Sequence, residues 1–213
     1  MGISSQLLAV FWRSRKIIFI VAVAFFCTLF VAMIVSYFLL AASPQMLTLI
    51  EDFIAGQQAL LGLPPPMTSD FYWLIFLNNI GHFWNPGRVW VWVPFVGAFS
   101  LGYELILNAV LIGAVASYAS LARGPAFAIA GLTPHGVVEL PAFILEFAAL
   151  ARWHITASRA LYGKIGGRQV DRPLLIQGVT DTLVLSVVSV ALFAIAAYIE
   201  TFITPGLMAS QSP

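Results

Sequence analysis

The stretch LTPHGVVELPAFILE, residues 132–146, places one imidazole and two carboxyl groups inside an otherwise apolar segment. At 100° per residue in an α-helix, Glu139 lies about 40° and Glu146 about 20° from His135, so the three share one face. His135 and Glu139 are about 6 Å apart along the axis and can pair, whereas Glu146 is about 16 Å from His135. Such a pair can supply two metal ligands, serve a transport pathway, or hydrogen-bond across helices as a structural pin.

The composition of the chain places these groups in a membrane. Hydrophobic residues make up 61% of the 213 residues, charged residues 9%, and the mean hydropathy is +0.95, whereas a soluble domain is about a quarter charged. We therefore expect a multi-pass protein of the cell membrane. The net charge of +1 and the lack of any nucleic-acid-binding module argue against nucleic acid as a partner. The single cysteine, Cys27, excludes a disulfide framework and a thiolate metal site.

Apolar runs of roughly 20 residues, the length that crosses a bilayer, predict an all-α, polytopic fold with about five transmembrane helices. We expect one integral membrane domain over residues 1–213, with spans at residues 17–42, 88–104, 105–122, 126–150 and 174–203. An outer loop is expected at residues 43–70, with a short amphipathic helix at about 46–61, and an interfacial helix is expected before Pro86. Residues 151–173 are expected to form a basic cytoplasmic loop.

Lysine and arginine set the expected orientation. Three of the ten precede the first span, and five lie within residues 151–173. Because basic residues concentrate on the cytoplasmic side, both segments should be cytoplasmic. Five crossings then place the N-terminus inside and the C-terminus outside.

The fourth span carries residues that disfavour a regular helix. Pro134 and Pro141 each remove a backbone donor, and Gly136 weakens the same region. We therefore expect a broken fourth helix. Irregular backbone at membrane depth is tolerated only inside protein or beside a wet cavity, so the polar face should meet neighbouring helices or enclosed water.

Other spans also carry polar or small residues at helical spacing. A charge at membrane depth costs roughly 2.5–3.5 kcal/mol, so Glu104 and Asn108, which share a face, should point toward protein. Ala109, Gly113 and Ser117 form a small-residue series that permits close helix contact. His82 and His154 are assigned to regions away from His135.

Three motifs, PHGVVELPA, LILNAVLIGAV and AYIETFITP, together resemble the stage II sporulation protein M family of five-span membrane proteins, over about residues 71–205. In spore-forming bacteria the namesake is a membrane subunit that works with two peptidoglycan-cleaving partners in engulfment, and it is not itself known as the hydrolase. Members also occur in organisms without spores. Asn78-Asn79 corresponds to the family's Asn before its second span. The resemblance marks Asn108, Pro134, His135, Gly136, Glu139, Glu200 and Pro205. Together with the residues argued above, the candidate polar cluster is Glu104, Asn108, His135, Glu139, Glu146 and Glu200.

These observations favour a non-catalytic membrane subunit that acts as a scaffold or in membrane remodelling. Its expected partners are membrane lipid and further copies of the chain or other membrane proteins. One alternative is a transporter component that uses His135 and Glu139, and a second is an intramembrane metal-dependent hydrolase. The chain has no His-Glu-x-x-His motif and no recognisable nucleophile turn, so we predict no catalytic residue, no metal and no cofactor.

Overall fold

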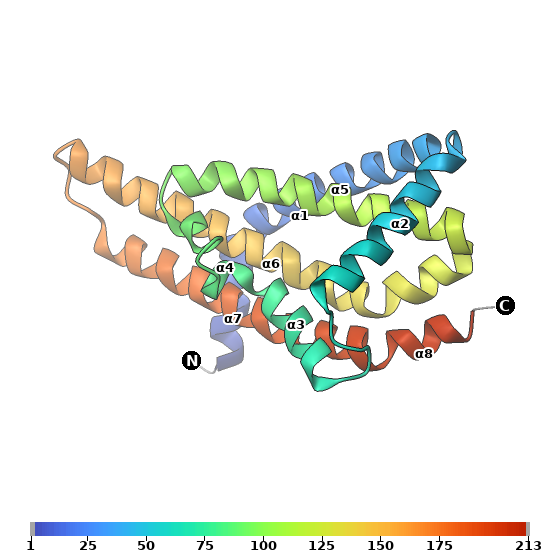
Figure 1. The fold of residues 1–213 in the computed structure, drawn as a ribbon. Helices are drawn as coiled ribbons and strands as arrows, with labels where there is room; N and C mark the ends of the chain where they lie inside the picture. Colours follow the sequence, from blue (N-terminus) through green and yellow to red (C-terminus); the bar gives the residue numbers. More distant parts are fainter. Residues whose placement is uncertain (1–2, 212–213) are drawn as a thin grey trace. The chain divides into compact units, whose positions relative to one another are not determined.

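The computed structural model describes residues 3–211, without the side chains of residues 3, 54, 55 and 57–61, and this part of the chain is helical without strands (Figure 1). The helices are α1 (Ile3–Ala41), α2 (Pro44–Leu61), α3 (Ser69–Asn79), α4 (Gly81–Trp84), the 3-10 helix η1 (Val89–Trp92), α5 (Val96–Arg123), α6 (Pro125–Ile165), α7 (Arg172–Phe202) and α8 (Thr204–Ala209). The all-α prediction is confirmed, and the helix expected at about 46–61 is present as α2.

Within residues 3–211, four helical stretches are long and apolar enough to cross a membrane. They are Ser4–Ala41, Val96–Arg123, Pro125–Ile165 and Arg172–Ala209. The expected boundary between spans at residues 104 and 105 is wrong, because α5 is one continuous helix of 28 residues. Glu104 does not interrupt the helix because its carboxylate is hydrogen-bonded by Ser100 and His82. The first part of the expected span, residues 88–95, holds η1 and a turn in which Phe95 has φ 67°.

The expected break in the fourth helix is also wrong, since α6 runs without interruption for 41 residues. Pro134, Gly136 and Pro141 all lie inside it. Each proline removes only one backbone donor, and membrane helices tolerate this because neighbouring groups satisfy the freed carbonyls. The same helix continues through most of the basic segment 151–173 and ends where Gly167 adopts φ 68°. The connection to α7 is therefore only residues 166–171, closed by a bond from the Arg168 amide to the Gly163 carbonyl.

The described residues pack as two compact units. Unit 1 contains the chain up to Phe25, Ile80–Ile106 and Leu140–Phe193, and unit 2 contains Phe26–Asn79, Leu107–Glu139 and the chain from Ala194. The expectation of a single membrane domain stays a prediction.

In unit 1, parts of α1, α6 and α7 share an apolar core. Val10, Leu145, Ala149 and Leu185 are buried against one another. The Ser189 hydroxyl of α7 donates to the Ala142 carbonyl of α6 at 2.8 Å. In a membrane such contacts stabilise the helices through van der Waals packing, and the hydroxyl bond fixes how the two helices face each other.

In unit 2, α1 and α5 approach closely through small residues. A Cβ on Gly113 would lie 2.8 Å from the Met33 amide nitrogen and 2.9 Å from the Leu29 carbonyl oxygen. Four residues later, the Ser117 hydroxyl donates to the Met33 carbonyl at 2.8 Å. Contacts advance in the same direction along both helices, so α1 and α5 are parallel here. Ala109, the third residue of the small series, is fully buried.

Candidate functional site

The polar residues of α6 belong to different local environments. His135 and Glu139 lie in unit 2, and Glu146 lies in unit 1. Each acidic residue meets polar partners from other helices. His135, Glu139 and Glu146 share one face of α6, but the first two belong to one group of side chains and Glu146 belongs to another.

In unit 2, His135, Glu139 and Glu200 form what we call the His135 cluster. Each offers one nitrogen or oxygen atom, and these three atoms lie within 4.8 Å of one another. The Nε2 atom of His135 is 3.7 Å from Oε2 of Glu139, as the four-residue spacing on α6 predicts. Glu200 is supplied by the last turn of α7. The family resemblance marks this residue, but helical periodicity alone does not bring it to His135.

Two further side chains orient the His135 cluster. Asn79, the last residue of α3, donates its Nδ2 hydrogen to Oε1 of Glu139 at 2.9 Å. The Thr204 hydroxyl oxygen lies 3.4 Å from Nδ1 of His135. Sequence analysis assigned no role to Thr204, and it noted Asn79 only through the family resemblance.

A cavity of about 480 Å³ adjoins the cluster in unit 2. Its polar lining comes from His135, Glu200 and Thr204, and its other walls are apolar. These walls are formed by Pro66, Phe71, Val115, Ala119, Phe127, Ala128, Gly131, Leu132, Pro205 and Met208. The arrangement therefore places an imidazole and a carboxyl group beside a largely apolar, partly open space.

In unit 1, His82, Glu104 and Glu146 form what we call the His82 network. Nε2 of His82 is 2.5 Å from Glu104, and Nδ1 is 3.0 Å from Glu146. Sequence analysis missed His82, which is 3% exposed, because α4 is a single short helix with no periodic pattern. Both ring nitrogens of His82 are therefore engaged by carboxyl groups, one from α5 and one from α6.

A second charged group in unit 1 joins α1, α6 and α7. The fully buried carboxylate of Asp181 accepts hydrogen bonds from Arg13, with one nitrogen at 2.5 Å, and from Arg152 at 2.8 Å. Because a buried carboxylate is stable only when paired, this arrangement ties the three helices together. The sequence places Asp181 early in the last span but does not identify its partners.

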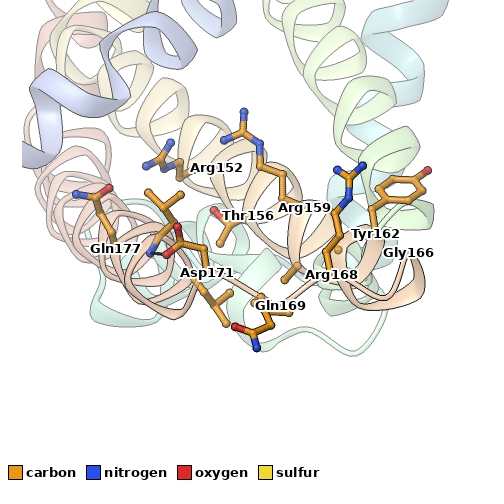
Figure 2. Close-up of a pocket in the computed structure, with 14 residues that line it drawn as sticks. Arg152, Thr156, Arg159, Tyr162, Gly166, Arg168, Gln169, Asp171 and Gln177 are labelled. Atoms are coloured by element: carbon orange, nitrogen blue, oxygen red, sulfur yellow. Dashed lines mark hydrogen bonds between the residues drawn. The ribbon is translucent and has the colours of Figure 1, made fainter.

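A basic cavity of about 610 Å³ lies where α6 joins α7 in unit 1 (Figure 2). Arg152, Arg159 and Arg168 line it together with Tyr162, and Figure 2 shows Arg159 and Arg168 extending away from Gln169. Asp171 is the acidic residue of the lining, and its carboxylate accepts the Leu174 amide at the start of α7, at 3.1 Å. The cavity is thus lined by more positive than negative groups.

The remaining predicted site residue, Asn108, is half-buried on α5.

Comparison with known proteins identifies the family of this chain. Residues 17–205 match the family model for stage II sporulation protein M. The chain is 31% identical over 120 residues to an uncharacterized protein of Methanocaldococcus jannaschii, covering 54% of this chain and 65% of that protein, and so spans less than two thirds of its length. No solved structure matches. The chain therefore belongs to the stage II sporulation protein M family.

Proposed function

We propose that this membrane protein is a non-catalytic subunit that organises or remodels the membrane with partner proteins, and that it binds anionic lipid in the basic cavity. The cavity is the observation that carries the proposal. Guanidinium groups bind phosphate through paired hydrogen bonds. Those of Arg159 and Arg168 line this space beside Arg152, which is paired with Asp181. Tyr162, whose ring meets Phe95 with centroids 5.2 Å apart, is the type of residue enriched at membrane interfaces.

The charged groups of unit 1 support a structural and not a catalytic use. Both ring nitrogens of His82 are engaged by carboxylates. Both carboxylate oxygens of Asp181 accept hydrogen bonds from arginines. A general acid or base must reach a reacting group with the same atoms, and here those atoms are already engaged within the chain.

We also propose that the chain crosses the membrane five times, with its N-terminus in the cytoplasm. Because α1 and α5 are parallel, both cross the membrane in the same direction. The chain between them must therefore cross back. Residues 42–95 therefore supply the second crossing, in place of the span expected at residues 88–104. Arg13 of α1 and Arg152 of α6 both pair with Asp181, so the two basic segments lie on the same side of the membrane. Because lysine and arginine concentrate in cytoplasmic loops, we assign that side to the cytoplasm. The basic cavity then faces the leaflet that is rich in anionic lipid.

This orientation is tested by cysteine labelling in intact cells, with Cys27→Ala as the background. We expect Glu51→Cys and Gln211→Cys to react with an impermeant maleimide. Gln169→Cys should react only after the cells are opened. Labelling of Gln169→Cys from outside would contradict the orientation.

The lipid-binding function is tested with purified protein in discs that contain phosphatidylglycerol and phosphatidylcholine. We expect the double variant Arg159→Gln/Arg168→Gln to lose its preference for phosphatidylglycerol by about tenfold, the scale of one or two charge-assisted hydrogen bonds. The matched control is Lys164→Gln/Arg172→Gln, which removes the same charge from residues outside the cavity lining. Equal preference in the two double variants would overturn the proposal. The transport and hydrolase alternatives depend on His135 and Glu139 in unit 2 and stay predictions.

A further inference from the structure

We infer that His135, Glu139 and Glu200 bind a divalent transition-metal cation through Nε2 of the imidazole and one oxygen of each carboxylate. This inference concerns unit 2 and does not depend on the lipid-binding function proposed for unit 1. It differs from our expectation from the sequence that the chain holds no metal.

The three donor atoms have the spacing that a metal ion needs. They lie within 4.8 Å of one another, and the His135 to Glu139 separation is 3.7 Å. In a tetrahedral zinc site with ligand bonds of about 2.0–2.2 Å, neighbouring ligand atoms are about 3.3–3.6 Å apart. The His135 and Glu139 atoms are thus almost at the required separation, and a small side-chain movement of Glu200 completes the site.

The surrounding hydrogen bonds leave the correct atoms available. Asn79 engages Oε1 of Glu139, so Oε2 is the oxygen that faces His135. The Thr204 hydroxyl lies 3.4 Å from Nδ1 of His135 and can accept a hydrogen bond from the ring when Nδ1 carries the proton, a tautomer that leaves the lone pair of Nε2 for a metal. Metal-binding histidines and carboxylates are commonly oriented in this way, through the atom that does not bind the metal.

The cluster places two carboxyl groups beside one imidazole. Among the described residues no lysine or arginine pairs with either carboxyl group. Asp181 shows how this chain neutralises a buried carboxylate when a basic side chain is the partner. The His135 cluster has only an imidazole, and a bound divalent cation balances its two carboxylates.

The adjoining cavity supplies the remaining coordination position. His135 and Glu200 both line this space of about 480 Å³, so water or another small ligand has room to complete the metal's coordination. One imidazole with two carboxylates suits zinc, manganese or iron, whereas magnesium and calcium prefer oxygen ligands alone. We therefore assign the site to a transition metal and use zinc and cobalt as probes.

The test uses the full chain in lipid discs, stripped of metal and titrated with zinc. We expect about one zinc ion per chain, and at least tenfold weaker binding for His135→Ala, Glu139→Gln and Glu200→Gln. Asn79→Leu should weaken binding about tenfold, the lower end of the usual effect of an orienting group. His154→Gln and Glu51→Gln, which remove a histidine and a carboxylate elsewhere, should bind zinc as the natural chain does.

A readout on the natural chain keeps the test independent of how the variants fold. Cobalt that is bound by one nitrogen, two carboxylate oxygens and a water shows the visible absorption bands of a site with few ligands. Added zinc should displace the cobalt and remove these bands. The absence of these bands in the natural chain overturns the inference. Zinc binding that is equal in the natural chain and in all three ligand variants also overturns it.

Discussion

The His82 network and the His135 cluster are built from the same parts, one histidine and two glutamates, with one glutamate of each taken from α6. They differ in how the ring nitrogens are used. In the His82 network both nitrogens contact a carboxylate, at 2.5 and 3.0 Å. In the His135 cluster one nitrogen lies beside a hydroxyl and the other is 3.7 Å from its carboxylate. The first arrangement is complete by itself, and the second is complete only with a cation.

The largest difference should appear when each histidine is removed. His82→Ala leaves Glu104 and Glu146 without the ring nitrogens that contact them, and Glu146 is 1% exposed. Breaking a buried charge pair costs about 3–5 kcal/mol, so we expect the free energy of unfolding to fall by about that amount. His135→Ala in metal-free protein should cost less than about 1 kcal/mol, because the two polar contacts it loses, at 3.4 and 3.7 Å, are both long.

Equilibrium unfolding of both variants in detergent, with chelator present, checks this difference. Equal losses of stability in the two variants would mean that the two groups are both structural pins.

Two glycine-to-alanine substitutions, one in each unit, should have opposite effects on stability. In unit 1, a Cβ on Gly178 would lie 2.2 Å from the Thr156 hydroxyl oxygen, so Gly178→Ala should destabilise the chain by about 1–3 kcal/mol. In unit 2, a Cβ on Gly136 meets nothing within 4 Å, and Gly136→Ala should stabilise α6 by about 0.5–1 kcal/mol. Thermal unfolding of the two variants measures this difference. A larger loss of stability in Gly136→Ala than in Gly178→Ala would contradict the prediction.

The smallest expected effect is that of Glu200→Gln in metal-free protein. This change leaves one carboxyl group in place of two in the His135 cluster, so the chain should become more stable by about 0.5 kcal/mol, the usual scale for a partly exposed charge pair. Unfolding in the presence of chelator measures the gain. A loss of more than about 1 kcal/mol would indicate instead that the Glu200 carboxylate accepts hydrogen bonds that stabilise the fold.

Sequence patterns predicted the long helices well and their interruptions poorly. Length and apolarity identify α1, α6 and α7 because a bilayer sets both properties. Proline and glycine in residues 134–141 suggested a break that α6 does not have, since one missing donor does not end a helix at membrane depth. Conversely, the sequence predicted α2 and one helix before Pro86, whereas the structure divides residues 69–92 among α3, α4 and η1.

The candidate site was predictable only where its residues lie on one helix. His135 and Glu139 meet because they are one helical turn apart. Helical spacing also placed Glu146 on their face, yet its partner His82 comes from a distant segment. Partners such as Asn79, Thr204 and Asp181 depend on contacts between helices, which single-helix geometry does not contain.

The measurement that tests the central contrast most directly is the zinc-induced change in unfolding temperature of three proteins, the natural chain, Glu200→Gln and Glu104→Gln. A ligand that binds only the folded state raises its stability. We predict that zinc stabilises the natural chain and Glu104→Gln to the same extent and leaves Glu200→Gln unchanged. Equal stabilisation of all three proteins, or its loss in Glu104→Gln alone, would contradict the assignment of the His135 cluster as the ligand site and the His82 network as the structural one.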